Sequence, residues 1–359
     1  WLYTPWMEKL GLQTPSTTEE FYEVLKAFKT QDPNGNGLAD EVPMAGSTDR
    51  VDWRHAFMNP FVDMGNGDYY AVKDGQVYAS YTQEGWREGL RYVKRLVDED
   101  LLSPLTFTQD LAQLTAMSAN QPTILGGSVY SSMSFLPGDD QRRADYDGIP
   151  PLYNEELGRP LTRYIPSTAN IAMIINANCE NIEAAFRLGD IMVSEEYSIH
   201  TRWGERGVDY LTPKEGDVSI YAALGYEPTL TAVLVWGKPQ NKHWAQTGPY
   251  IRQYSIAGGQ IFDGNNLNVE VKVGEILQSY QAAKPDEVIS KLIYTAEEID
   301  QIAEIQANLK SYAEECLALF ATGVMDIDND WDQFQEELKV IGIDEVMTVV
   351  QTVYDRMYK

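Results

Sequence analysis

The sequence lacks several features that would assign it to common classes of protein. No run of 18 apolar residues occurs, so no segment is predicted to cross a membrane as a helix. Only two cysteines are present, Cys179 and Cys316, which excludes a disulfide framework and leaves one long-range bridge undecided. Because each cysteine lies in an expected helix, free buried thiols are favoured. Positive charge is also scarce: 28 Lys and Arg against 54 Asp and Glu give a net charge of −26, which disfavours nucleic acids and anionic membranes as partners.

Signatures of several enzyme classes are missing as well. The three histidines, His55, His200 and His243, are scattered, and no His/Cys metal cluster can be formed from the sequence pattern. Neither a Gly-x-Ser-x-Gly elbow nor a phosphate-binding loop occurs. A glycoside hydrolase, however, needs only two facing carboxylates, and a chain with 54 acidic residues leaves that class open.

What the sequence does contain is typical of a globular protein with a sizeable core. Hydrophobic residues make up 43% of the 359 residues, a length that suggests two or three folding units. The 22 Tyr and 8 Trp are more than a core of Leu and Ile requires. Their flat apolar faces and polar edges suit surfaces that hold partly polar ligands, although packing is the commoner role of any single ring.

Hydrophobic periodicity predicts helices separated by short apolar strands. Thr17 and Glu20 form a capping box ahead of one apolar helical stripe, and further helices are expected over 83–99, 180–200, 297–322, 330–340 and 344–357. Residues 121–127 read as a short buried strand that enters a glycine turn, and the run Ala169–Ala177 reads as a fully buried strand. Ile182, Ala185, Phe186 and Gly189 are expected on the buried side of the helix that follows. Alternating strands and helices without repeats predict an α/β protein of two lobes.

The most specific motif is the loop that begins at Asp32. Oxygen-bearing side chains occupy positions 1, 3, 5 and 9 with glycine at position 6, which is the front of an EF-hand calcium loop. The bidentate Glu of position 12 is replaced by Pro43. We expect a structural calcium ion with ligands from Asp32, Asn34, Asn36, the carbonyl of Leu38, Asp40 and Glu41. The alternative is an Asx-rich surface turn.

A second acidic run repeats part of this spacing. Residues 326–332 carry carboxylates at positions 1, 3 and 5, but Trp331 stands where the glycine turn is needed. We interpret this run as an acidic helix start rather than a second calcium site.

Three segments resemble a known family. The segment from Pro15 to Pro43, the run 200–213 (HTRWGERGVDYLTP) and the tail from Phe320 to Val346 are similar to family 1 extracellular solute-binding proteins of ABC importers. The resemblance is to the clade of oligosaccharide-binding lipoproteins of Gram-positive bacteria, close to the alginate-oligosaccharide binders. Trp203 stands where that clade often has Tyr.

The resemblance implies a type II periplasmic-binding-protein-like α/β fold, with the ligand in a cleft between two lobes. Residues 1–165 are expected in the second lobe, 166–292 in a return segment of the first lobe, and 293–359 in closing helices of the second lobe. The chain begins at Trp1 without a signal peptide or lipid-attachment cysteine. We therefore expect a monomeric cell-surface lipoprotein whose anchor and first-lobe start are not included, and whose partner is an ABC permease.

Candidate ligand-binding residues combine aromatic rings with polar groups, because sugar rings offer an apolar face and a rim of hydroxyls. The candidates are Trp53 with Arg54, Tyr130 with Ser128, Trp203 with Glu205, and more weakly Trp236 and Trp244. The expected function is capture of an oligosaccharide, with no catalysis. A secreted glycoside hydrolase and a calcium-stabilised surface carbohydrate-binding protein or scaffold are the alternatives.

Overall fold

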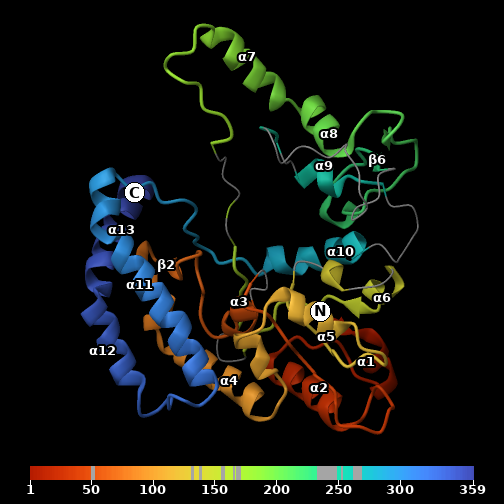
Figure 1. Cartoon of the computed structure of the whole chain (residues 1–359), viewed down its shortest axis with the longest axis vertical. Coiled ribbons are helices and arrows are strands. Elements are labelled where there is room, and N and C mark those ends of the chain that lie inside the picture. Colours follow the sequence, from red (N-terminus) through yellow and green to blue (C-terminus); the bar gives the residue numbers. More distant parts are fainter. Residues whose placement is uncertain are drawn as a thin grey trace. The chain divides into compact units, whose positions relative to one another are not determined.

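The computed structural model describes residues 1–49, 53–130, 133–136, 140–154, 158–164, 166, 171–232, 249–251, 254–261 and 269–359. The chain divides into two compact units. Figure 1 shows their helices and strands coloured along the sequence. Unit 1 combines Trp1–Thr168 with Ser279–Lys359, and unit 2 is Ala169–Gln278. The expected assignment of these parts to a second and a first lobe remains a prediction.

Unit 1 is mainly helical. Its helices are α1 (Thr4–Leu10), α2 (Thr18–Thr30), α3 (Trp53–Met58), α4 (Glu84–Asp98), α5 (Leu111–Ser118), α6 (Asp140–Ala144), α11 (Ala296–Ala321), α12 (Trp331–Ile341) and α13 (Ile343–Tyr358), with 3-10 turns at Ser80–Thr82, Pro104–Phe107 and Met133–Phe135. Its strands are β1 (Leu2–Tyr3), β2 (Tyr70–Lys73), β3 (Gln76–Ala79) and β4 (Tyr146–Asp147).

Unit 2 contains α7 (Ile182–Met192), α8 (Glu195–Trp203), α9 (Tyr254–Gly258) and most of α10 (Val269–Ala282), with β5 (Tyr210–Leu211), β6 (Thr231–Ala232) and a 3-10 turn at Ala222–Leu224. β5 pairs antiparallel with β6. Among the described residues of the whole chain, no helix is long and apolar enough to span a membrane.

Short pairings connect distant segments of unit 1 into one sheet region. β1 pairs antiparallel with β4, and Leu2 also pairs antiparallel with Gly127. On the other side of 125–128, Leu125 and Ser128 pair parallel with Val42 and Ala45, and the neighbouring Met44 pairs parallel with Leu102. The strand expected at 121–127 is therefore present as brief pairings around Leu125 rather than as a full strand. Because the segments 42–45 and 125–128 run parallel to each other, their carboxyl ends lie at the same edge of this sheet region.

The predicted capping box and most of the predicted helices are confirmed. The Thr17 hydroxyl accepts from the Glu20 backbone N–H at 3.1 Å, and the Glu20 carboxylate accepts from the Thr17 N–H at 3.2 Å. This capping box starts α2, whose Phe21, Leu25 and Phe28 are buried. The helices expected over 83–99, 297–322, 330–340 and 344–357 correspond to α4, α11, α12 and α13.

The main core of unit 1 joins residues from both ends of the sequence. α11 packs against α4, α12 and α13, and α13 packs against β3, as the blue and orange elements of Figure 1 illustrate. Phe320 and Phe334 meet edge-to-face with ring centroids 5.7 Å apart. Cys316 is buried in α11 as a free thiol, as expected. Cys179 is free as well, but it is only half-buried and lies before α7 begins, so its expected burial in a helix is wrong.

The prediction of a buried strand at Ala169–Ala177 is wrong for the described residues 171–177. No strand forms there, and the side chains of Ile171 and Ile174 are 84% and 83% exposed. The physical reason is that a strand that is apolar on both faces needs a neighbour at each edge, and no described residue pairs with this segment.

The helix expected over 180–200 is interrupted, and its expected buried side is exposed. It forms α7 and α8, with Ser194 capping α8 through the Tyr197 N–H. Ile182 and Phe186 are 58% and 66% exposed, and Ala185 and Gly189 are only partly covered. Helical periodicity identified the apolar side of α7, but not whether another element covers it.

Candidate functional site

The loop after α2 brings its polar side chains together. Asp32 Oδ1 and Oδ2 accept from the N–H groups of Gly35 and Gly37 at 2.9 and 3.1 Å. Asn34 and Asn36 direct their amide nitrogens toward the Asp40 carboxylate, at 2.8 Å and 3.0–3.1 Å. Gly37 at position 6 has a φ of +76°, the left-handed conformation that such a loop requires.

Glu41 is the buried member of the same loop. Its side chain is 3% exposed, and its Oε1 has no hydrogen-bond partner among the described residues. An unsatisfied buried carboxylate oxygen is costly unless a positive charge compensates it. The Leu38 side chain is 61% exposed, which leaves its carbonyl as the group it offers to the loop. These six residues carry oxygen atoms of the kind that Ca²⁺ prefers, and in this structure the Asn34 and Asn36 side-chain oxygens accept from backbone N–H groups of the loop.

One cation of the chain already lies beside this loop. Lys9 Nζ donates to the carbonyls of Asp32 and Pro33 at 3.3 and 2.7 Å, so it binds the outer backbone rather than the carboxylates. Within the described part of the chain, no group of three or more His, Cys, Asp and Glu side chains is placed to hold a metal ion. The donor set of the loop accordingly depends on asparagine and carbonyl oxygens as well as carboxylates.

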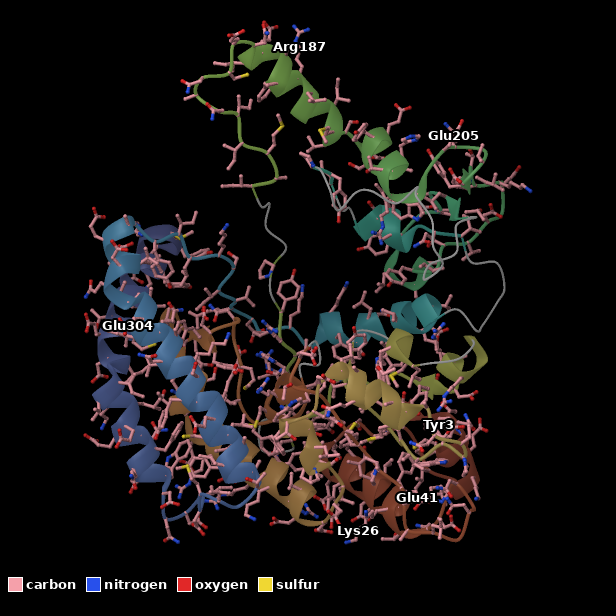
Figure 2. All side chains as sticks on the ribbon, in the orientation of Figure 1. Tyr3, Lys26, Glu41, Arg187, Glu205 and Glu304 are labelled. Carbon is pink, nitrogen blue, oxygen red and sulfur yellow. The ribbon has the colours of Figure 1, made fainter. Side chains whose placement is uncertain are left out.

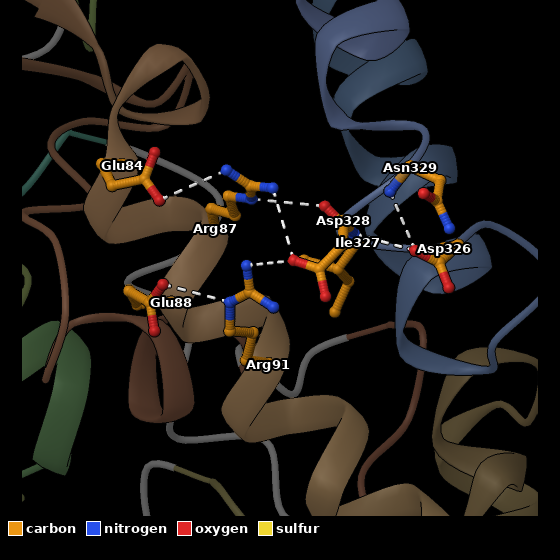
Figure 3. A network of polar contacts seen from close by, with 8 residues as sticks. All are labelled: Glu84, Arg87, Glu88, Arg91, Asp326, Ile327, Asp328 and Asn329. Atoms are coloured by element: carbon orange, nitrogen blue, oxygen red, sulfur yellow. Dashed lines mark hydrogen bonds and ion pairs between the residues drawn. The ribbon is translucent and has the colours of Figure 1, made fainter.

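The second acidic run has a different arrangement (Figure 3). Asp328 accepts from Arg91 Nη2 at 2.5 Å and from Arg87 Nη2 at 3.4 Å, and hydrogen bonding to Arg91 lowers the pKa of Asp328. The Asp326 carboxylate accepts from the N–H groups of Asp328 and Asn329, both at 2.9 Å. The run thus leads into α12 as expected. The charge of Asp328, however, is neutralised by two arginines of α4 and not by the N–H groups at the start of α12.

Two candidate ligand residues lie at the carboxyl end of the parallel pairing in unit 1. Ser128 pairs with Ala45 and is fully buried, and its Oγ has no hydrogen-bond partner among the described residues. Tyr130 is half-buried, packs edge-on against Phe135 at 5.2 Å, and accepts at its carbonyl from Trp1 Nε1 at 2.9 Å. The tyrosine ring is therefore partly accessible at this edge.

Trp53 lies near the same edge but in the core. The ring is 1% exposed and packs edge-on against Phe107 at 5.0 Å, so it is not an open platform in this structure. Its Nε1 and the Nε of half-buried Arg54 are both buried without a hydrogen-bond partner among the described residues. The Arg54 guanidinium lies 5.1 Å from the centre of the Trp53 ring.

The residues that fix Trp53 in place carry no signal in the sequence. A Cβ on Gly46 would lie 3.0 Å from Trp53 Cδ1 and 2.9 Å from Thr106 Cγ2, so glycine allows the indole to pack against the backbone. Thr106 Oγ1 accepts from the Gly46 N–H at 3.0 Å, and Gln109 Nε2 donates to the Gly46 carbonyl at 2.6 Å. No hydrophobic periodicity marks these residues, because they lie in a 3-10 turn and in irregular segments.

The remaining candidates belong to unit 2. Trp203 is 3% exposed in a small core with Leu230 and Ile256, and its Nε1 has no hydrogen-bond partner among the described residues. Glu205 is exposed at the turn after α8, where its N–H donates to Asp209 at 2.8 Å. Trp236 and Trp244 lie outside the described residues. The ligand-binding roles of all these residues remain predictions.

The chain matches known proteins over almost its whole length. It is 25% identical over 374 residues to the fructooligosaccharide ABC transporter substrate-binding protein FusA of Streptococcus pneumoniae, a match that covers 99% of this chain and 65% of that protein. The chain is thus similar to a substrate-binding protein of a carbohydrate ABC transporter. This finding confirms the resemblance stated above. No family model matches the chain.

Solved structures show the same fold. FusA in complex with kestose aligns with a TM-score of 0.76 and 23% identity over 99% of this chain and 71% of that chain. An HMO-binding, ABC-transporter-associated solute-binding protein of Bifidobacterium longum infantis aligns with a TM-score of 0.73 and 19% identity over 100% of this chain and 73% of that chain. The alginate-binding protein AlgQ2, solved without calcium ion, aligns with a TM-score of 0.64 and 20% identity over 99% of this chain and 71% of that chain. The chain thus has the solute-binding-protein fold and spans about two thirds of the length of FusA.

Proposed function

We propose that this chain is the main part of the substrate-binding component of an ABC importer, which captures an oligosaccharide outside the cell and delivers it to a permease. The observation that carries this proposal is the match to FusA along 99% of the chain, together with the division into two compact units. FusA is the substrate-binding protein of a fructooligosaccharide ABC transporter, and carbohydrate is the ligand class inferred for this chain. The role requires binding and release, not catalysis.

The ligand would contact unit 1 at the carboxyl ends of 42–45 and 125–128. Ligands of open α/β sheets bind at such edges. Ser128 Oγ, Trp53 Nε1 and Arg54 Nε are buried polar atoms without described partners, and sugar hydroxyls, which can both donate and accept, would satisfy them where ligand binding uncovers them. Half-buried Tyr130 supplies an aromatic face at the same edge. From unit 2, Trp203, Glu205 and Trp236 are the candidates.

The loop from Asp32 to Glu41 would hold a structural Ca²⁺. The spacing of the oxygen-bearing side chains and the unsatisfied oxygen of buried Glu41 support this proposal. Among the related structures, one is an EF-hand mutant of FusA and another is AlgQ2 without calcium ion. The ion would neutralise the carboxylates and fix the turn between α2 and residues 42–45, and its role would be structural.

The protein would act as a monomer on the outer cell surface, held there by an N-terminal lipid anchor. A shorter match supports the lipoprotein assignment: the chain is 29% identical over 136 residues to lipoprotein LipO of Bacillus subtilis. The transport role implies a partner permease of an ABC importer and a ligand of the oligosaccharide class.

Thermal unfolding of the full-length protein across a panel of neutral and acidic oligosaccharides tests the proposal. A ligand that binds only the folded state at 100 times its Kd stabilises it by about 2.7 kcal/mol, which raises the Tm measurably. We expect a rise with one class of oligosaccharide and no new reducing ends after prolonged incubation. Turnover of the sugar would instead identify a glycoside hydrolase, and a Tm that no sugar changes would favour a scaffold role.

A further inference from the structure

Arg54 in α3 is a half-buried cation without a counter-ion. Its side chain forms no hydrogen bond or ion pair with a described residue, and its Nε is buried. The chain has 54 acidic residues for 28 basic ones, so carboxylates are plentiful. Six other described arginines each hold one, namely Arg87, Arg91, Arg95, Arg159, Arg187 and Arg356. Arg54 differs from all of these in leaving its charge unpaired.

The acidic residues nearest to Arg54 in the described sequence have other partners. Asp49 Oδ1 accepts from the Leu111 N–H at 2.7 Å, and Asp63 Oδ1 accepts from the Gly65 N–H at 2.9 Å. An arginine cannot escape the cost of burial by losing its proton, and a charge that is partly removed from water is costly unless an opposite charge compensates it. The compensating negative charge is absent from the described part of the chain.

The outer end of the Arg54 guanidinium is open to solvent. Among its three nitrogens, Nε alone is both buried and without a hydrogen bond. The two Nη nitrogens have no hydrogen bond with a described residue either, so they must be accessible. The Trp53 ring, whose centre lies 5.1 Å from the guanidinium carbon, is 1% exposed. Two N–H groups at one planar, accessible end match the two oxygens of a carboxylate.

Arg54 lies beside the ligand edge proposed above. The neighbouring Trp53 packs on Gly46, which directly follows Ala45, the partner of Ser128 in the parallel pairing. The polar atoms without a described partner at this edge are two N–H donors, Arg54 Nε and Trp53 Nε1, and the Ser128 hydroxyl. A sugar hydroxyl needs an acceptor for its own proton, whereas a carboxylate needs donors alone. The edge therefore suits a group that only accepts.

The negative charge of the whole chain does not exclude an anionic ligand. The net charge of −26 repels anions at a distance, but an ionic strength of 0.1 M screens charges that are more than about 10 Å apart. Hydrogen bonds between a guanidinium and a carboxylate in direct contact are roughly twice as strong as neutral ones. The local contact at Arg54 therefore outweighs the distant repulsion.

We propose that the oligosaccharide captured by this chain carries a carboxylate, as a uronic acid does, and that Arg54 binds this carboxylate through its two Nη nitrogens. This inference rests on the proposed function, because it names the class of sugar for that site. A neutral oligosaccharide would leave the guanidinium charge uncompensated. Arg54 is then the residue that separates acidic from neutral oligosaccharides.

Calorimetric titration of the full-length protein with uronic acid oligosaccharides and with their methyl esters tests the proposal. The probes are the trimers of galacturonic, glucuronic and mannuronic acid; each ester keeps the ring hydroxyls and removes the charge. We expect at least one acid to bind at least about 10-fold more tightly than its ester. Arg54→Gln should weaken binding of that acid by roughly 10- to 100-fold and change binding of the ester by less than about 2-fold. Arg54→Lys keeps the charge without the planar fork and should recover part of the loss.

Arg187→Gln is the matched control. Arg187, labelled in Figure 2, donates to Glu183 on α7 at 2.6 Å and belongs to no candidate ligand set, so the affinity for the acid should be unchanged. If Arg54→Gln does not fold, the ratio of acid to ester affinity in the wild type decides the ligand class, and Arg54→Lys decides the role of the residue.

Separate outcomes would overturn the separate parts of the proposal. Equal affinity for acid and ester, or binding of neutral oligosaccharides only, would overturn the acidic ligand and leave the transport role intact. An acid-to-ester ratio that Arg54→Gln does not change would remove Arg54 from the contact. If neither acidic nor neutral oligosaccharides bind, the proposed function fails together with this inference.

Discussion

The carboxylate of Glu298 is bound by the guanidinium of Arg356, which joins the first turn of α11 to the last turns of α13. Arg356 Nη2 donates to Glu298 Oε2 at 2.9 Å, and Nη1 donates to Oε1. Hydrogen bonding to Arg356, with a second contribution from the Thr295 N–H, lowers the pKa of Glu298 from 4.5 to about 2. The pair therefore makes the stability of the α11–α13 contact depend on pH.

Substituting Glu298→Gln should reveal this dependence. Because the folded-state pKa lies below the usual value, the carboxylate contributes stability that is complete above about pH 5 and is lost as the pH falls toward 2. The gap in urea midpoint between the wild type and the Gln variant should therefore be constant from pH 8 to 5 and narrower at pH 3.5. Glu304→Gln, at an exposed residue of α11 labelled in Figure 2, is the control and should show no such narrowing. A pH-independent gap would contradict the assignment.

Removing the capping box should destabilise unit 1. Thr17→Ala leaves the Glu20 N–H without its acceptor at the start of α2, and the loss of such a cap costs about 1 kcal/mol. The urea midpoint should fall while the slope of the transition stays the same. Thr30→Ala at the other end of α2 removes only a hydroxyl that bonds the Lys26 carbonyl, and it should change stability by less than about 0.5 kcal/mol. Equal effects of the two substitutions would count against the capping role.

Chelation should distinguish the two acidic runs. If the loop after α2 holds Ca²⁺, EDTA lowers the Tm of the wild type, and Glu41→Gln lowers the Tm in calcium while reducing the further effect of EDTA. Asp328→Asn should lower the Tm by the same amount with and without EDTA, because its partners are Arg87 and Arg91. Calorimetric titration with Ca²⁺ provides a second readout. A wild type that is indifferent to both EDTA and Ca²⁺ would leave the loop an ordinary turn.

Ser128→Ala and Trp53→Phe test the proposed sugar-binding site at the carboxyl ends of segments 42–45 and 125–128. Ser128→Ala removes one buried hydroxyl that has no described partner, so the ligand-free protein should lose little stability or gain some. Trp53→Phe also removes buried ring volume, so it should lower the Tm of the ligand-free protein, and only its effect on the Kd tests the site. Binding of the stabilising oligosaccharide should weaken by roughly 5- to 10-fold for each, the equivalent of one hydrogen bond. Trp331→Phe, in the core at α12, is the control for indole loss and should leave the Kd unchanged. Unchanged affinity in both test variants would remove this edge from the binding site.

Features set by a few neighbouring residues could be predicted from the sequence. The capping box of Thr17 and Glu20, the amphipathic helices and the glycine turn at Gly37 depend on contacts within one or two turns of chain. The convergence of Asn34, Asn36 and Asp40 follows from the same local spacing.

Features set by distant partners could not be predicted. The apolar run 171–175 has the composition of a buried strand, but burial depends on strands that lie elsewhere in the sequence. Trp53 was expected as a platform, and its burial results from Gly46, Thr106 and Phe107, none of which is its neighbour in sequence. Likewise, Asp328 resembles a metal ligand until the arginines of α4 are in place.

Unit 1 is built from the two ends of the chain, and this has a consequence for the order of folding. Its core contains Phe21 and Trp86 together with Phe320 and Val350, so the hydrophobic contacts span more than 250 positions of sequence. During synthesis, residues 1–168 must wait for α11, α12 and α13 to leave the ribosome, and long-range contacts of this kind slow folding. The nascent first part therefore exposes the surface that α11 later covers, which makes it the stage at which this protein most needs protection from aggregation.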